Sequence, residues 1–473
     1  MSQILLPLTG IVTASFLARK LGTAGYGILI LASMLVSWIE FAITSLFSRA
    51  TVKFIGDAED WRPIGTAALR LYLYVSLCAM FGCWILAKPI ASLLHEPELA
   101  FYFALFALDL PVFALAHCHR SILVGKGYYA ERARISAGRW LSRLVLIILL
   151  VELGLSVKGA ILGNIGASVV ELAVGRYYIR PSWKKREAPP VSLWDYAVPI
   201  FLATISLRLM GLGLFLLKML GASPEIAGIY GAAQNLSFVM PGIFAVSLSP
   251  LLLSTMTRVL KENNLPAAKI LGCNAIRAVI VALPLAAAAS GASGEIAVLL
   301  FGVPFAAAGR LISVLVFAGL ANMLINLLNA ILIANGNPAW PLKLAGPILP
   351  LAIALHLLAI PRFGPMGAAV VTTTVSCLGA SAGLVIVRRL VGITSPLPTL
   401  LRALLLSGVA YGLVYVYPTT GFMVLVKVAV AVILVLGAFI ALGEFPPDEI
   451  SFFKSIIDRA LSRNSNRHQN SRI

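Results

Sequence analysis

Several charged side chains stand inside long apolar stretches, where a charge is costly unless it has a partner or a role. Arg208 lies near the middle of the apolar stretch 197–217. An arginine at the centre of a bilayer costs at least about 2.5–3.5 kcal/mol. Its guanidinium can donate charged hydrogen bonds to an anion, and it can equally form an ion pair with a nearby carboxylate. We favour the anion site and keep the ion pair as the alternative.

Other cations stand at the ends of apolar stretches, where they could attract or receive an anionic group. One set occupies similar places after the first and seventh stretches and consists of Arg19, Lys20 and Lys218. A second set, near the opposite ends of their stretches, consists of Arg49, Arg70 and Arg277. The alternative for the first set is that the side chains simply reach for the headgroups. For the second set, it is that they anchor the chain on the cytoplasmic side.

The stretch 307–334 carries three amides, Asn322, Asn326 and Asn329. Spacings of four and three residues place them on one face of a helix. Such a stripe can hydrogen-bond sugar hydroxyls in a polar lumen, or it can join neighbouring helices inside the membrane. We favour the lumen.

Glu40 and Asp109 are the carboxylates that lie deepest in apolar stretches. A carboxylate in such a place can carry a proton, so both are candidates for coupling to an ion gradient. The alternative is that they neutralise Arg70, Arg143 or Arg208.

The sequence predicts neither a metal site nor a bound cofactor. His117 and His119 flank Cys118, but residues two apart on a helix point to different faces. Phosphate-binding loops, dinucleotide fingerprints and zinc-protease motifs are absent from the sequence.

The elements that must position these side chains are membrane-spanning helices. The chain is 60% hydrophobic and 12% charged, which exceeds what a soluble domain of 473 residues can bury. It contains many apolar stretches of about 20 residues, the length that spans a bilayer as a helix. We therefore predict an all-α polytopic membrane protein. About fourteen helices are expected, over 3–18, 25–47, 66–87, 99–122, 136–155, 158–179, 197–217, 226–254, 269–290, 307–334, 341–360, 366–388, 398–417 and 421–443.

The distribution of basic residues predicts the orientation of the chain. The net charge is +18, and most Lys and Arg fall in the N-terminus, the even-numbered loops and the C-terminus. This pattern is typical of cytoplasmic segments, so we expect both termini in the cytoplasm and the protein in the cytoplasmic (inner) membrane. Anionic lipid headgroups are expected partners. Nucleic acid is not, because the basic residues are dispersed over many segments.

The first 390 residues carry one pattern twice. Phe16–Gly22 is answered by Phe215–Gly221, each followed closely by a Tyr-Gly pair. Ile122–Gly127 is answered by Ile331–Gly336, at an offset of 209 residues. Such a duplication in a membrane protein is typical of a transporter that works between two halves. Because each copy holds six helices, an even number, the two copies are related by an axis along the membrane normal.

The repeat predicts how the chain is divided. An N-terminal six-helix bundle covers 1–180, and a cytoplasmic linker covers 181–196. A C-terminal six-helix bundle covers 197–390, and an additional helix pair covers 391–443. The tail 444–473 is expected to be a short amphipathic helix on the cytoplasmic face followed by a disordered end.

A resemblance to a known family rests on three places in the sequence. Ala18–Gly27 reads A-R-K-L-G-T-A-G-Y-G and resembles the A-R-x-L-G-x-x-x-Y-G signature of Wzx-type polysaccharide flippases. These belong to the multidrug/oligosaccharidyl-lipid/polysaccharide flippase superfamily. Arg49 stands where such proteins often carry an arginine, and Ile331–Asn337 is similar to the end of their tenth helix.

The resemblance implies a transporter that is not an enzyme. It would move a lipid-linked oligosaccharide, typically on undecaprenyl diphosphate, from the inner to the outer leaflet for surface polysaccharides such as O-antigen. The headgroup would pass the cations named above in a central basic cavity by alternating access, and polymerase machinery would be a partner. Two other functions stay open, a lipid II flippase and a MATE-like exporter of drugs or cations. A membrane glycosyltransferase is disfavoured, because no loop is long enough to hold a catalytic domain.

Replacing Arg208 with alanine is expected to abolish polymer export, because an anionic headgroup would lose its partner in the middle of the membrane. Export is measured as polymer at the cell surface, and immunoblotting of membranes checks that the variant is present. Normal export by a variant at normal abundance would show that Arg208 is not the anion site.

Overall fold

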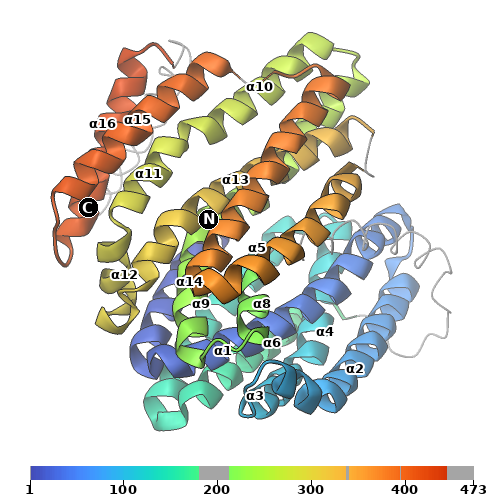
Figure 1. The fold of residues 1–473 in the computed structure, drawn as a ribbon. Helices are drawn as coiled ribbons and strands as arrows, with labels where there is room; N and C mark the ends of the chain where they lie inside the picture. Colours follow the sequence, from blue (N-terminus) through green and yellow to red (C-terminus); the bar gives the residue numbers. More distant parts are fainter. Residues whose placement is uncertain (1, 181–211, 337–339, 395, 445–473) are drawn as a thin grey trace, which may run out of the picture.

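The computed structural model describes residues 2–180, 212–336, 340–394 and 396–444, and within these residues the chain is all-α (Figure 1). The predicted fold class is therefore confirmed. A π-helix, η1 (Val151–Leu155), and a 3-10 helix, η3 (Val303–Phe305), interrupt the α-helices. The α-helices are α1 (Ser2–Asp57), α2 (Trp61–Leu93), α3 (Leu99–Ala107), α4 (Asp109–Gly125), α5 (Tyr129–Leu150), α6 (Ser156–Tyr178), α8 (Gly213–Met219), α9 (Pro224–Lys261), α10 (Leu265–Val281), α11 (Leu283–Gly291), α12 (Ser293–Phe301), α13 (Ala308–Ala334), α14 (Trp340–Val391), α15 (Leu397–Val416) and α16 (Met423–Ala441).

Nine helical stretches in the described residues are long and apolar enough to cross a membrane. Three of them, Pro7–Asp57, Tyr129–Tyr178 and Leu342–Val391, have 50 or 51 residues. At about 1.5 Å per residue, each of these is long enough to cross twice. The predicted helix 197–217 lies mostly outside the described residues, so the count of fourteen stays a prediction. The predicted linker 181–196 and nearly all of the tail 444–473 also lie outside them.

Glycines in the left-handed region mark equivalent turns in the two copies of the repeat. Gly127 and Gly336 have φ angles of 75° and 76°, and Gly22 and Gly221 have angles of 68° and 90°. Other L-residues adopt this conformation at a cost, because their Cβ approaches the following carbonyl oxygen. The sequence repeat is therefore a backbone repeat at these two turns.

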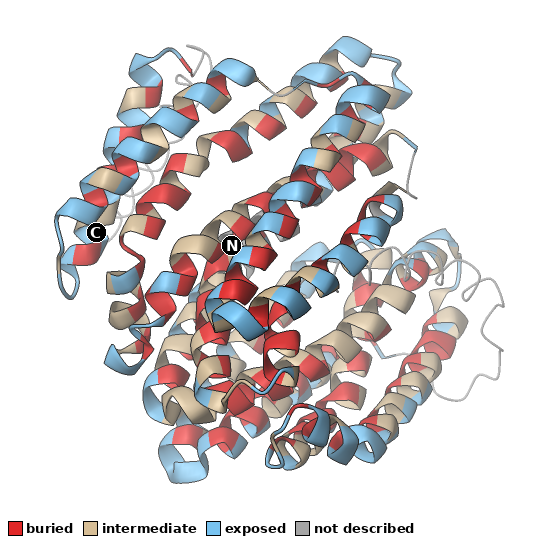
Figure 2. Cartoon of the chain, viewed as in Figure 1, coloured by how far each residue is buried: buried red, intermediate tan, exposed pale blue. Residues whose placement is uncertain are grey.

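Helices α1–α6 form the first half of the molecule, and α8–α16 form the second half (Figure 1). The largest apolar core lies between the halves and joins side chains of both, including Tyr26 and Phe106 with Tyr230 and Phe305. Figure 2 shows buried residues along the inner sides of the helices and exposed residues on the outer sides. For a membrane protein, an apolar exposed surface is the one that faces lipid.

The halves touch most closely where α1 crosses α9. A Cβ on Gly27 would lie 2.0 Å from the Pro224 carbonyl oxygen, and a Cβ on Gly228 would lie 2.1 Å from the Thr23 carbonyl oxygen. Backbone meets backbone here, so any side chain larger than hydrogen would push the helices apart. Gly27 and Gly228 come from the repeated Tyr-Gly segments, which thus meet across the boundary between the halves. Small residues permit the same close approach in other membrane helix pairs.

Helices α15 and α16 lie beside α10 and α11 and are tied to the second half at both ends (Figure 1). At one end Glu295 of α12 forms an ion pair with Lys427 of α16 and accepts a hydrogen bond of 2.7 Å from the Thr419 amide in the turn between the pair. At the other end Glu444 follows α16. Its carboxylate lies 2.8 Å from Arg402 of α15, and its carbonyl oxygen accepts a hydrogen bond from Arg277 of α10.

The crossing of α1 and α9 predicts a large effect from a single methyl group. Gly228→Ala is expected to destabilise the folded protein by about 1–3 kcal/mol, because the new Cβ cannot fit against Thr23. Thermal unfolding in detergent measures this as a lower midpoint. Gly82→Ala in α2 is the matched control, since a Cβ there meets nothing within 4 Å. Equal midpoints for the two variants would contradict the contact.

Candidate functional site

The structure separates the predicted site residues into several places. Arg208 lies outside the described residues, so its role stays a prediction. Helix α1 is kinked at Gly22. Three of the predicted cations lie at this end of the molecule, namely Arg19, Lys20 and Lys218. We call this end the outer end, after the orientation predicted from the charges.

Arg19 and Lys218 join the two halves at the outer end. Arg19 of α1 donates hydrogen bonds to the carbonyl oxygens of Leu299 (2.6 Å) and Leu300 (3.1 Å) at the end of α12. Lys218 of α8 is buried, and its Nζ lies 3.0 Å from Oε2 of Glu96, between α2 and α3. Both side chains are therefore engaged in contacts between the halves at this end.

The remaining predicted cations have different surroundings. Lys20 is exposed and pairs with Glu152 at 2.7 Å within the first half. Arg49 is exposed, and Arg70 is half-buried. Arg277 belongs to the junction of α10 with the α15–α16 pair, where it donates to the Glu444 carbonyl oxygen.

The three amides of α13 differ in their partners and in their exposure. Asn322 donates to Ser376 of α14 at 3.0 Å and thus joins two helices. Asn326 is exposed and donates to the Asn322 carbonyl oxygen at 2.8 Å. Asn329 is buried, and its amide has no hydrogen-bond partner among the described residues. One member therefore acts between helices, while Asn326 is accessible to a ligand.

Six ionisable side chains from four helices gather inside the first half. Helix α1 supplies one, α4 two, α5 two and α6 one. We call them the arginine–carboxylate cluster, and its members are Glu40, Asp109, Arg120, Arg139, Arg143 and Glu171. The cluster holds three cations and three carboxylates, so its charges balance when all six are ionised. Balance is what a low-dielectric interior requires of buried charges.

Glu171 is the centre of the cluster. Its carboxylate is fully buried and lies 2.8 Å from Nη1 of Arg139. Nε of Arg120 lies 3.0 Å from the other carboxylate oxygen, without the alignment of a hydrogen bond. One carboxylate from α6 thus holds guanidinium groups of α4 and α5.

The other two carboxylates of the cluster differ in exposure. Asp109 is fully buried and accepts a hydrogen bond of 2.9 Å from Asn164 of α6, while its second oxygen has no partner among the described residues. Glu40 is partly exposed, as is Arg143. Glu40 lies within electrostatic range of Asp109, Arg139 and Arg143. The cluster therefore extends from the interior of the first half to accessible surface.

Two of the arginines keep a buried donor without a partner. In the described part of the chain, the buried Nε atoms of Arg139 and Arg143 have no hydrogen-bond partner, whereas Nε of Arg120 lies in the ion pair with Glu171. Aromatic rings flank the guanidinium groups, with Phe113 4.6 Å from Arg139 and Trp140 5.7 Å from Arg143. Buried donors without acceptors are uncommon in folded proteins. Two such donors, already positioned by rings and carboxylates, can bind an anion.

The sequence predicts a role for Glu40 and Asp109 and offers Arg143 as an ion-pair partner, but it does not place Arg120 or Arg139 beside them. These two count among the basic residues of the even-numbered loops in the predicted orientation, because each stands near the end of a predicted span. A signal was present in the spacing. Arg139 and Arg143 are four residues apart on α5, and Asn164, Ser168 and Glu171 follow spacings of four and three on α6. Such spacings put polar side chains on one helix face.

The repeat relates one face of α4 to one face of α13. The offset of 209 residues pairs Phe113, His117 and Arg120 of α4 with Asn322, Asn326 and Asn329 of α13. The amides of α13 thus stand in the places of an α4 face that carries one member of the cluster, Arg120.

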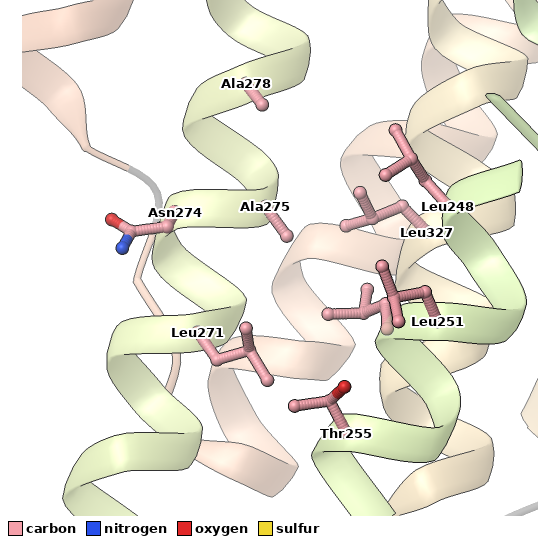
Figure 3. Close-up of a pocket in the computed structure, with 9 residues that line it drawn as sticks. Leu248, Leu251, Thr255, Leu271, Asn274, Ala275, Ala278 and Leu327 are labelled. Carbon is pink, nitrogen blue, oxygen red and sulfur yellow. The ribbon is translucent and has the colours of Figure 1, made fainter. Parts of the chain in front are cut away.

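A separate apolar cavity of about 290 Å³ lies between α9 and α10 (Figure 3). Leu271 and Ala275 of α10 face Leu251 of α9 across the space, and the amide of Asn274 points away from it (Figure 3). Leu251 is 60% exposed, so the cavity is open rather than sealed within the core. Its lining suits hydrocarbon.

Comparisons with known proteins agree with this architecture. The fold is similar to that of the lipid II flippase MurJ in an inward closed conformation, with a TM-score of 0.77 and 15% identity over 96% of this chain and 98% of that chain. It is also similar to the eukaryotic MATE transporter AtDTX14, with a TM-score of 0.59 and 14% identity over 86% and 98%. The Vibrio cholerae MATE transporter VcmN in the bent form gives a TM-score of 0.53 and 14% identity over 86% and 96%.

These likenesses concern the fold, and no match was found among curated protein sequences. The sequence itself matches a family at residues 16–308, well over half of the chain, and that family is described as polysaccharide biosynthesis protein. Together with the long apolar helices, the match indicates a multi-pass membrane protein. The chain belongs to the family described as polysaccharide biosynthesis protein, and the resemblance of Ala18–Gly27 to polysaccharide flippases agrees with this membership.

Proposed function

We propose that the protein translocates a lipid-linked oligosaccharide, carried on a polyprenyl diphosphate, from the inner to the outer leaflet of the cytoplasmic membrane. One observation carries the proposal within this family. Arg139 and Arg143 keep buried donors without acceptors inside the first half, beside Arg120 in its ion pair with Glu171. A diphosphate has oxygens on several sides, and charge-assisted hydrogen bonds from guanidinium groups suit it.

The rest of such a substrate finds complementary surfaces. The exposed amide of Asn326 on α13 is a candidate partner for sugar hydroxyls. The apolar cavity between α9 and α10 offers a hydrocarbon-like surface to the polyprenyl chain (Figure 3). Arg208 remains a candidate ligand for the diphosphate, and Arg49 and Arg70 remain candidates for its first contact at the cytoplasmic side.

Movement of the substrate needs no bond to form or break, only a change in which side is open. The contacts at the outer end support a state that is closed to the outside, with Arg19 on the end of α12 and Lys218 on Glu96. Rocking of the halves about the α1–α9 crossing would exchange this state for an outward-open one. Both termini would lie in the cytoplasm, and a polymerase outside the membrane would consume the product.

Two relatives within the superfamily define the alternatives, a lipid II flippase and a MATE-like exporter. Mass spectrometry of lipid-linked intermediates in cells that lack the protein separates them. A foreign oligosaccharide on polyprenyl diphosphate supports the proposal, and a disaccharide-pentapeptide lipid selects lipid II. Unchanged lipid pools together with sensitivity to a cationic drug would select the exporter.

Arg143→Ala is expected to slow translocation at least about tenfold, since a hydrogen bond to a charged group contributes about 1.5–3 kcal/mol. The rate is measured in proteoliposomes as the movement of a fluorescent lipid-linked oligosaccharide between leaflets. Arg134→Ala is the matched control on the same helix. The Arg134 side chain is 65% exposed and lies 3.9 Å from Glu131. Similar rates for the two variants would rule out the cluster as the headgroup site.

A further inference from the structure

We infer that the arginine–carboxylate cluster takes up protons when it binds an anionic headgroup, so that anion and proton are bound together. This inference rests on the proposed function of the cluster as a diphosphate site. Three steps lead from the cluster to proton uptake, and they concern the charge balance, the unpaired atoms and the competition for the guanidinium groups.

The first step is the charge balance. Three arginines face three carboxylates, so the empty cluster carries no net charge when all are ionised. A diphosphate that is esterified to the lipid at one end and to the sugar at the other adds two negative charges. Charges in a low-dielectric interior interact strongly, so an uncompensated addition of this size is opposed. Protonation of one or two carboxylates would restore the balance without any movement of the helices.

The second step concerns the unpaired atoms. One oxygen of Asp109 accepts no hydrogen bond in the described part of the chain, while the Nε atoms of Arg139 and Arg143 donate none. An anion would satisfy these two donors. A protonated carboxyl group is itself a donor, so a proton on the unpaired oxygen of Asp109 would supply one more hydrogen bond to a phosphate oxygen.

The third step concerns competition for the guanidinium groups. Arg120 and Arg139 are both held by Glu171, and a phosphate can bind them fully only if that carboxylate weakens its hold. Protonation removes the charge of Glu171 and releases both groups. By linkage, an anion that favours the protonated form must itself bind more tightly where protons are abundant.

Other titratable groups surround the cluster without replacing its carboxylates. On α4, His117 Nδ1 lies 2.8 Å from Arg120 Nη2, and His119 is bonded through Nδ1 to the Leu115 carbonyl oxygen. On α2 the buried Tyr72 ring lies beside His117. The histidines stand next to arginines, and a second positive charge there would be opposed. Among these groups the carboxylates are the proton acceptors that an incoming anion would favour.

The test is calorimetric titration of the full-length protein in nanodiscs with farnesyl diphosphate. Runs in two buffers of different ionisation enthalpy count the protons taken up per ligand. Proton uptake by the ligand itself is common to all variants and cancels in the comparison.

Wild type is expected to take up about one proton more than Glu171→Gln. Its affinity should rise about tenfold per pH unit on acidification for each proton linked to binding. Glu171→Gln should bind about tenfold more tightly at pH 7.5, because two guanidinium groups are released.

Two further variants serve as an alternative to Glu171→Gln and as a control. Glu40→Gln changes a partly exposed carboxylate, so it carries the same comparison if Glu171→Gln does not fold. Glu152→Gln changes an exposed carboxylate that pairs with Lys20 elsewhere in the first half, and it should match wild type. Equal proton counts in wild type, Glu171→Gln, Glu40→Gln and Asp109→Asn would overturn the coupling while the headgroup site stands. Failure of wild type to bind farnesyl diphosphate at pH 6 and at pH 7.5 would overturn the proposed function as well.

Discussion

The ion pairs of Glu171 with Arg120 and Arg139 are the interaction on which the interior of the first half depends. They join α4, α5 and α6 at a place where water cannot compensate a lone charge. Loss of the carboxylate would leave two cations facing each other in a low-dielectric interior, a far larger cost than loss of the whole group. The same contact determines what the site can bind, because a guanidinium group held by a carboxylate is not fully open to another anion.

The boundary between the halves obeys a steric constraint instead of an electrostatic one. Gly27 and Gly228 allow α1 and α9 to touch through their backbones, and Arg19 and Lys218 add polar contacts nearby. A contact made mostly of backbone has few side chains that must repack when the helices turn against each other.

Much of the architecture could be predicted from the sequence, because hydropathy decides which segments enter a membrane. The turns at Gly127 and Gly336 followed from the repeat, since a glycine in the left-handed region leaves a sequence trace. The cluster could be predicted only in part. Glu40 and Asp109 stood out by depth, whereas Arg139 needs a partner on another helix to explain its burial. Which helices face each other is a tertiary fact that one sequence does not contain.

The pair α15–α16 is fastened at both ends, by Glu295 at the turn and by Glu444 after the last helix. A helical hairpin that is held at a single end could rotate about that end and move independently of the rest of the protein. Held at two ends, it must travel with the second half, so it widens that half without adding a degree of freedom. The annulus of lipid around the pair would therefore be displaced whenever the halves rock, and the stiffness of the bilayer would enter the energy of each cycle.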